Sequence, residues 1–406
     1  MIRKQIIPLL LLAVTPASAQ QTITLQISNP SKIVRTDAPV AISLSEYGDI
    51  KSALVTIDGN EIPCQLDDFD KDGVFDELAF VTDLDKKQKK RVDITLYKNG
   101  TPRTYQPRTF AEIVIRNPKV TEKNKHDIYL SSITVDKETA NSYNVLHHHG
   151  VAFESELIAL RIYFDQRQTL DLYGKFHKGL ELKDTQFYTS KEQKQQGYGD
   201  DVLWVGNTFG LGALRGWNGT EPTMLSDVQH RTQRILAKGP VRTIIEVEDN
   251  GWTVSPSLQP INMIIRYTLY AGHRDFNVDV RFNRNVPEYQ FATGIINVKE
   301  SEEFTDKDGL RGCWGTDWPS TDTLNWKRET VGLGIYIPTL HRVSEQPANK
   351  DNYGYVVKAT DNQLHYNLVY TSANEEFGYH QAKDWFNFLK EWKKELLSPI
   401  DVRIVN

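Results

Sequence analysis

The stretch HHHGVAFESELIALRIYFDQRQTLDLYGK, from His147 to Lys175, shows the alternation that decides the fold class. We take Val151 to Asp165 as one extended strand, followed by a second strand, because side chains on a strand point alternately to opposite faces. The apolar residues then share one face: Ile158, Leu160, Ile162, Phe164, Leu170 and Leu172. The other face carries Arg161, Tyr163, Asp165, Asp171, Tyr173 and Lys175. The stretch therefore predicts a β-sheet with one buried face and one polar face.

The polar face has two explanations. A solvated outer face would hold cross-strand ion pairs, which accounts well for Asp165 and Arg167. A ligand-binding face accounts better for the mixture of tyrosines and cations, because convergent ionisable groups mark binding and catalytic sites. We therefore expect this face to bind a ligand.

His147, His148 and His149 stand directly before the strand, and the first and third share the parity of Arg161. A zinc site needs ligands that converge on one point. Adjacent histidines usually diverge and no fourth ligand is obvious, so we expect no metal here. Glu154 has the parity of the apolar residues, and it must therefore be paired, lie beyond the core edge or follow a β-bulge.

Two further segments suit a sugar ligand. Residues 200–219, DDVLWVGNTFGLGALRGWNG, are rich in glycine but lack the Gly-Lys-Ser/Thr ending of a phosphate loop. Arg215 beside Trp217 suits an anionic sugar, with a cation for the carboxylate or sulfate and an indole for the ring. Trp314 and Asp317 in GCWGTDWPS form a similar loop. A glycine-rich turn packed on the core is the alternative explanation.

The rest of the chain predicts two β units. Residues 20–105 contain short alternating runs separated by Asn, Gly, Pro and Asp, which is typical of a sandwich of immunoglobulin-like size. Residues 106–406 contain longer strands and one helical stretch, HQAKDWFNFLKEWKKELLS, whose apolar residues recur at three- and four-residue steps. We predict a mostly β protein: a small N-terminal immunoglobulin-like β-sandwich, then a large antiparallel sandwich with a C-terminal helix.

The N-terminus predicts export. Residues 1–19 have the basic start, apolar run and small-residue end of a signal peptide, so we expect cleavage after Ala19 and a periplasmic or secreted protein. No later stretch is apolar enough to span a membrane. The 53 acidic residues outnumber the 48 Lys and Arg, which argues against a nucleic-acid partner. Cys64 and Cys313 would pair in an oxidising compartment or remain as two buried free thiols.

An acidic turn lies in the first unit. Asp68, Asp70 and Asp72 are spaced as in the first positions of a calcium loop, but the twelfth position is Ala79 instead of Glu. We expect these aspartates to shape a hairpin turn and to contribute little to catalysis. A looser structural calcium site is the alternative, and we expect no other cofactor.

Four stretches together resemble a secreted bacterial family that is catalogued only as a domain of unknown function: the opening stretch, WVGNTFGLGALRGWNG, AKGPVRTIIEV and YTLYAGHRDFNVDV. The resemblance covers roughly residues 25 to 406. Members of this family are usually found among polysaccharide-degradation proteins. The later strands resemble the galactose-mutarotase-like super-β-sandwich, in which a concave sheet face holds a sugar. The resemblance implies that fold and a carbohydrate substrate, and it supplies no established mechanism.

We expect a β-elimination on an acidic oligosaccharide in the degradation of a polysaccharide such as ulvan or pectin. A cation neutralises the uronate carboxylate, a base removes the C5 proton and an acid protonates the leaving oxygen. Loss of the next sugar makes a lyase and loss of water makes an oligosaccharide dehydratase; both leave a 4,5-unsaturated uronate. The candidate catalytic residues are His149, Tyr163 and Arg161. The candidate substrate-binding residues are His147, His148, Glu154, Asp165, Tyr173, Lys175, Arg215, Trp217, Trp314 and Asp317.

Two other functions remain open, because the super-sandwich fold serves several chemistries. A glycoside hydrolase needs two opposed carboxylates, and Glu154 or Glu156 with Asp165 or Asp317 would be the candidates. A non-catalytic sugar-binding protein would need the aromatic residues but no base.

Overall fold

The computed structural model describes residues 20–137 and 142–405. Residues 1–19, where we expect the signal peptide, lie outside the described residues. Within these residues the chain forms five sheets, all built from antiparallel strand pairs, and three helices. The mostly β fold class with a C-terminal helix is confirmed. No described helix is both long enough and apolar enough to cross a membrane.

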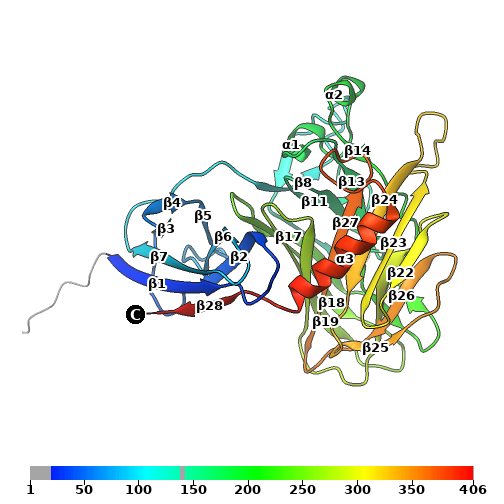
Figure 1. Ribbon diagram of the computed structural model, residues 1–406. Coiled ribbons are helices and arrows are strands. Elements are labelled where there is room, and N and C mark those ends of the chain that lie inside the picture. The colour runs from blue at the N-terminus through cyan, green and yellow to red at the C-terminus, as the bar shows by residue number, and fades with distance from the viewer. Residues whose placement is uncertain (1–19, 138–141, 406) are drawn as a thin grey trace, which may run out of the picture.

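The N-terminal unit is a small sandwich of two sheets, drawn in blue to cyan in Figure 1 except for the red strand β28. Its strands alternate inward and outward residues, and Leu25, Phe80 and Ile94 are among the fully buried inward side chains. The first sheet consists of β28 (Asp401–Ile404), β1 (Gln20–Ser28), β7 (Lys89–Tyr97), β3 (Ser52–Ile57) and β4 (Asn60–Ile62), in that order. The second consists of β2 (Arg35–Ser43), β6 (Glu77–Leu84) and β5 (Cys64–Asp67).

The last strand of the chain belongs to this first sandwich. β28 pairs with β1, with Leu25 opposite Ile404 and Ser28 opposite Asp401, and Figure 1 shows the C-terminal end beside β1. The sequence division had assigned the whole of residues 106–406 to the second unit. A short alternating run does not reveal which sheet edge it will join, and β1 offers an edge whose backbone groups need partners.

The larger unit contains a nine-stranded sheet within the described part of the chain. Its inner face contributes Val247, Phe276 and Leu368 to the main core, and its outer face carries the C-terminal helix. The strand order is β10 (Ser132–Asp136), β17 (His230–Ala237), β18 (Arg242–Trp252), β19 (Ile261–Tyr270), β20 (Asp275–Phe282), β27 (Gln363–Ser372), β24 (Glu329–Tyr336), β23 (Leu310–Asp317) and β22 (Glu302–Thr305).

Two smaller sheets form the opposite layer and share the same core, to which they contribute Phe153, Leu172 and Phe291. One has the order β14 (Asp200–Asp201), β13 (Leu170–Gly174), β12 (Ala159–Tyr163), β11 (Gly150–Ser155), β8 (Thr109–Ile115) and β9 (Ile128–Leu130). The other has the order β16 (Pro222–Thr223), β15 (Arg215–Trp217), β21 (Phe291–Ile296), β26 (Asn352–Val357) and β25 (Arg342–Glu345).

The opening stretch forms a hairpin and not the single strand expected over residues 151–165. β11 and β12 pair with Glu154 opposite Ala159 and Ala152 opposite Arg161. Because the chain reverses between them, even-numbered residues of β11 share a face with odd-numbered residues of β12. Glu154 therefore lies on the polar face and not with the core. The turn at residues 156–158 carries no Gly, Pro, Asn or Asp, so no turn signal marks this position in the sequence.

The three helices differ in role. α3 (Ala382–Leu396) buries Trp385, Leu389 and Trp392 against the outer face of the nine-stranded sheet, as its apolar spacing predicts. α1 (Leu182–Thr185) and α2 (Lys191–Gln195) are short and lie within the segment that covers the polar face of β11–β13.

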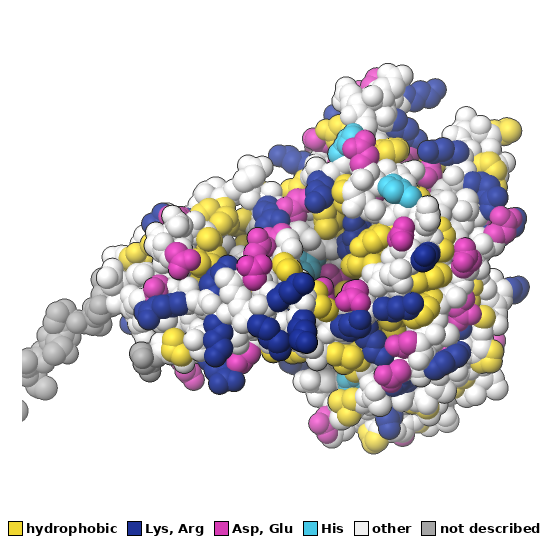
Figure 2. Space-filling view, in the orientation of Figure 1, with side chains coloured by type: hydrophobic (Ala, Val, Ile, Leu, Met, Phe, Trp, Pro, Cys, Tyr) yellow, Lys and Arg dark blue, Asp and Glu magenta, His cyan; other side chains and the backbone are white. Residues whose placement is uncertain are grey.

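The two units are joined by ion pairs. The buried Arg242 contacts the buried Asp67 at 2.7 Å and the partly exposed Glu77 at 2.7 Å. Arg108 contacts Asp37 at 2.7 Å, and both of these side chains are partly exposed. Figure 2 shows Lys and Arg side chains gathered near the middle of this face, where the two sandwiches meet.

Cys64 and Cys313 are free and buried. They lie in different units, and burial raises the pKa of the Cys64 thiol to about 11 and of the Cys313 thiol to about 12. The structure therefore favours the expectation of two unreactive thiols over that of a disulfide.

Candidate functional site

The predicted polar face exists, but the chain covers much of it. Every residue of β11, β12 and β13 is buried. On the polar side, Leu182 and Phe187 from residues 176–199 pack on Ala152 and Tyr173. The alternation correctly placed Arg161, Asp171 and Tyr173 on one face of the sheet. It could not show that a later segment of the chain folds over that face.

Lys175, Glu154 and Tyr173 anchor this covering segment, although they were predicted to contact substrate. The fully buried Lys175 Nζ lies 2.6 Å from Glu154 Oε2, and Glu154 also accepts hydrogen bonds from two backbone N–H groups at the start of α1. The Tyr173 hydroxyl contacts Glu181 Oε2 at 2.8 Å and Gly199 O at 2.7 Å. These three side chains hold the cover in place and are closed off from a ligand.

Arg161 forms the buried centre of the remaining polar face. Its Nη2 lies 2.7 Å from Asp171 Oδ2 and 3.0 Å from Asp201 Oδ2. The Phe187 ring lies 4.2 Å from the guanidinium carbon. Burial, together with the charge of Asp171, raises the pKa of Asp201. Arg161 was predicted to be catalytic, but it is only 4 % exposed and satisfied by two carboxylates, so it positions its neighbours.

Tyr163 extends this network toward the surface. Its hydroxyl donates to Asp171 Oδ2 at 2.6 Å. Burial and the charge of Asp171 raise the pKa of Tyr163 well above its usual value, so the hydroxyl stays protonated at neutral pH. Its ring meets the Tyr143 ring edge-on at 5.2 Å and lies 4.7 Å from the Arg167 guanidinium. Tyr163 is thus a proton donor held in a fixed position.

His149 lies beside Tyr163 and is only half-buried. Its ring stacks on Tyr143 at 3.7 Å, and its Nδ1 lies 2.8 Å from the Tyr143 carbonyl oxygen. Because a carbonyl can only accept, Nδ1 carries the proton and Nε2 presents a lone pair. Among the described residues nothing hydrogen-bonds to Nε2.

Burial lowers the pKa of His149 to about 4, with a further contribution from the Arg161 charge. The ring is therefore neutral at physiological pH, as a general base must be. The backbone of His149 has φ 70°, a left-handed conformation that is uncommon for residues other than glycine. Such strained positions persist where the surrounding structure fixes them, and they concentrate at functional sites.

Arg167 supplies a cation beside Tyr143 and Tyr163, the two tyrosines that His149 also contacts. Its side chain is 19 % exposed and its Nε lies 2.8 Å from Asp165 Oδ2. The guanidinium lies 4.7 Å from the Tyr143 ring and 4.7 Å from the Tyr163 ring. Its Nη1 has no hydrogen-bond partner within the described part of the chain. Sequence reasoning assigned Arg167 only to a surface ion pair, because nothing in the alternation indicated the two tyrosine rings beneath it.

The other two histidines diverge from His149, as expected. The His147 ring lies 4.0 Å from that of His126, and burial lowers the pKa of His147 to about 3. His148 is fully buried, with its Nε2 3.2 Å from Glu112 Oε1. Burial lowers the pKa of His148 to about 3 and raises that of Glu112 to about 8. His148 is thus a core residue and not a substrate contact.

Arg215 cannot grip a substrate carboxylate in this structure. It is 2 % exposed, and its Nη2 donates to Thr169 Oγ1 at 2.9 Å and to the Thr208 carbonyl oxygen at 3.2 Å. Burial lowers the pKa of Arg215 to about 10. Trp217, two residues further on β15, is half-buried.

Trp314 and Asp317 lie on β23 of the nine-stranded sheet, in a different layer from His149. Trp314 packs with Trp385 beneath α3. The Asp317 carboxylate accepts a hydrogen bond from the backbone N–H of Trp318 at 2.8 Å. The structure therefore does not bring these two residues to the polar face.

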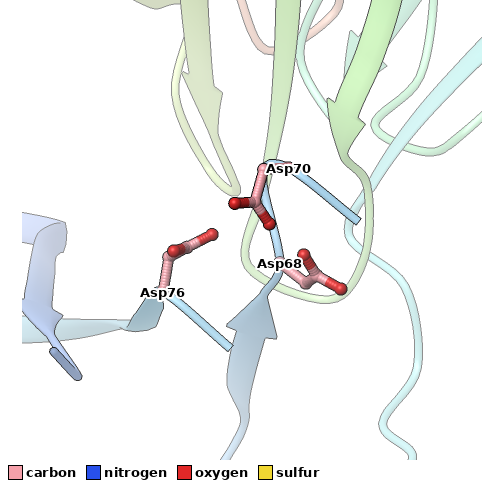
Figure 3. A group of neighbouring side chains, drawn as sticks. All are labelled: Asp68, Asp70 and Asp76. Atoms are coloured by element: carbon pink, nitrogen blue, oxygen red, sulfur yellow. The ribbon is translucent and has the colours of Figure 1, made fainter. Parts of the chain in front are cut away.

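The acidic turn joins β5 to β6 (Figure 3). Ligand oxygens of Asp68, Asp70 and Asp76 lie within 4.8 Å of one another, so Asp76 takes the place expected for Asp72. Backbone N–H groups donate to Asp68, Asp70, Asp72 and Asp76. These bonds fit the predicted hairpin turn, and the calcium site stays a prediction.

Comparisons with known proteins give a family and distant solved structures. A family model described as a domain of unknown function, DUF4861, matches residues 27–402. A protein in the glycosyl hydrolase family 38 from Enterococcus faecalis is 9 % identical, with a TM-score of 0.49, over 95 % of this chain and 47 % of its own. An alpha-mannosidase from Enterococcus faecalis V583 is also 9 % identical, with a TM-score of 0.48, over 95 % of this chain and 46 % of its own.

The chain thus spans about half the length of these two structures. No curated protein matches it.

Proposed function

For this chain, which belongs to the family described as a domain of unknown function, DUF4861, we propose a β-elimination on oligosaccharides that contain uronic acid. The product is a 4,5-unsaturated uronate. The enzyme is a dehydratase if a hydroxyl leaves as water and a lyase if the next sugar leaves.

The observation that carries the proposal is the orientation of His149. Its Nδ1 bonds to the Tyr143 carbonyl oxygen, which leaves Nε2 as a neutral, partly exposed base. The protonated Tyr163 hydroxyl and the Arg167 cation lie close by: the His149 and Tyr163 ring centroids are 6.3 Å apart. Base, acid and cation are the three groups that elimination beside a carboxylate requires.

The reaction needs no redox partner. Arg167 pairs with the substrate carboxylate and stabilises the charge that develops when His149 Nε2 takes the C5 proton. The C5–H electron pair forms the C4–C5 double bond, and the C4–O bond breaks with its electrons on oxygen. Tyr163 donates a proton to that oxygen and recovers one from the protonated His149, so the enzyme ends in its starting state.

The carboxylates that a hydrolase would use have other partners or lie apart. Glu154 is fully buried with Lys175, and Asp165 pairs with Arg167. Asp317 lies on β23, in the other layer, and accepts a backbone hydrogen bond from Trp318. Glu156 pairs with Arg108 and accepts a backbone hydrogen bond. Because a glycosidase needs a free acid and an opposed carboxylate, this geometry favours elimination.

Product analysis tests the proposal. The purified protein is incubated with uronate oligosaccharides from ulvan and from pectin, and the ultraviolet absorbance of a conjugated uronate is followed. Mass spectrometry then separates loss of one water from cleavage of the chain. Absence of an unsaturated product from every substrate, or release of saturated sugars only, would contradict elimination.

A further inference from the structure

A cavity of about 420 Å³ lies beside strand β14. Asp200, on one side of this strand, lines the cavity, and Asp201, on the other, contacts Arg161 at 3.0 Å. The cavity is therefore next to the buried polar face, and neither His149 nor Arg167 lines it. The lining residues that could contact a ligand include Lys194, Asp200, Trp326, Lys327, Glu329 and Asn374.

An aromatic ring and a cation form one wall. Lys194 Nζ lies 4.7 Å from the centroid of the half-buried Trp326 ring, and Lys194 also pairs with Asp200. Trp326 comes from the loop before β24, where the neighbouring Leu324 is 95 % exposed. A tryptophan held at the mouth of a cavity by an exposed loop provides a flat surface for a sugar ring.

Polar groups form the floor. Glu329 is 8 % exposed, and its Oε2 accepts a hydrogen bond from Asn374 Nδ2 at 2.7 Å. Lys327 Nζ lies 3.6 Å from Glu329 Oε1, although the Lys327 side chain is 71 % exposed. Burial raises the pKa of both Glu329 and Asp200. The cavity thus combines oxygen acceptors suited to hydroxyl groups with a cation that is free to turn toward a ligand.

We propose that this cavity binds one sugar residue of an acidic oligosaccharide, at a distance from the residue that reacts. The pyranose ring packs on Trp326, its hydroxyls bond to Glu329 and Asn374, and Lys327 pairs with a carboxylate or sulfate. This proposal rests on the proposed function for its substrate class. It adds a binding site in a part of the fold that the elimination chemistry does not use.

Binding measurements test the cavity without requiring turnover. The probes are oligogalacturonates and ulvan oligosaccharides of increasing length, titrated calorimetrically into the full chain carrying His149→Ala so that substrate is not consumed. Adding Trp326→Ala is expected to weaken binding of the longer probes roughly tenfold, in line with the energy of aromatic packing. Adding Lys327→Ala is expected to weaken acidic probes more than neutral ones, with a smaller effect at high salt.

Trp204→Ala is the control, because Trp204 is an exposed tryptophan that does not line the cavity and is not among the candidate site residues. Melting temperatures confirm that each variant is folded. Loss of affinity in Trp204→Ala but not in Trp326→Ala, or equal affinity in all variants, overturns the cavity proposal even when turnover is seen. Trp326-dependent binding without any unsaturated product upholds the cavity and overturns the elimination. Absence of binding by every probe overturns the cavity proposal.

Discussion

Lys175 and Glu154 form an ion pair with no solvent access, so neither side chain can be removed without leaving the other charge buried and unpaired. Both side chains are 0 % exposed. The ammonium also donates to the Ser155 carbonyl oxygen at 2.8 Å, and burial raises the pKa of Glu154. Removing one partner of such a pair leaves an uncompensated charge in the interior, which is far more damaging than removing both.

Lys175→Met is therefore expected to lower the free energy of unfolding by about 3–5 kcal/mol. Urea titration followed by circular dichroism measures this. Adding Glu154→Gln should recover part of the loss, because no charge is then left unpaired. The control is Lys137→Met, whose side chain is 51 % exposed in its pair with Asp227 and should change stability by less than about 1 kcal/mol. If Lys175→Met and Lys137→Met lowered the free energy of unfolding by equal amounts, burial of the ion pair would not determine its contribution to stability.

Glu112 gives a pH-dependent prediction. Burial raises its pKa from 4.5 to about 8. A raised carboxyl pKa stabilises the fold below pH 4.5, and this contribution is lost as the pH rises toward about 8. Glu112→Gln keeps the shape without the charge, so it should match the wild type at about pH 4.5 and be more stable by about 2–4 kcal/mol at about pH 8.

Urea titrations of wild type and variant across this pH range measure the difference. The exposed Glu122→Gln is the control. A stability difference for Glu112→Gln that does not grow with pH would show that Glu112 is already charged in the fold.

At the scale of elements, the covering segment 176–199 decides which polar residues can meet a ligand. It closes over Tyr173 and Lys175 but leaves His149 and Arg167 partly exposed. Strand parity predicted the side of the sheet for most of these residues, because alternation is a local property of the backbone. It could not predict their exposure, since that depends on a segment whose contacts are set only in the folded chain.

Two errors in the sequence prediction have different causes. Arg215 was expected at the ligand because cation and indole suit a sugar, yet it packs in the interior with Thr169. Glu154 was given the parity of the core because the turn before Ile158 lacks turn-forming residues. The helix containing Trp385 was predicted correctly, because its period of apolar residues is long and regular.

The pairing of β28 with β1 gives a prediction about this element. A chain that ends at Ile400 loses the strand that covers one edge of β1. Amide hydrogens of Gln20–Ser28 should then exchange faster, because part of their hydrogen bonding and packing is gone. Hydrogen exchange followed by mass spectrometry measures this, with β19 (Ile261–Tyr270) as the internal control. Unchanged exchange in β1 would mean that β28 contributes no protection.

At the scale of the whole molecule, the buried ion pair between Arg242 and Asp67 connects the two sandwiches. Arg242 is 3 % exposed and bonds to Asp67 from the first unit. Gln65 of the same strand donates to the Arg242 carbonyl oxygen at 3.0 Å. Interfaces between domains are usually mobile unless they are large or specifically bonded, so these contacts keep the first sandwich in place.

Arg242→Met should loosen this junction, because Asp67 would be left buried without its cation. The expected result is a larger radius of gyration in X-ray solution scattering and faster proteolysis of residues 98–107, which connect the two units. Arg91→Met is the control, since Arg91 is 71 % exposed in its pair with Asp93. A scattering curve identical to that of the wild type would show that other contacts suffice to hold the units together.

The central claim is that His149 removes a proton from the substrate, and its most direct test is the turnover of uronate oligosaccharides by His149→Ala. The matched control is His365→Ala, which removes a histidine paired with Asp279 on the nine-stranded sheet. We expect His149→Ala to turn over substrate roughly 10²–10⁴-fold more slowly than wild type, the range for loss of a general base, while its melting temperature is unchanged. We expect near-normal turnover from His365→Ala. Wild-type turnover by a folded His149→Ala variant would contradict the account.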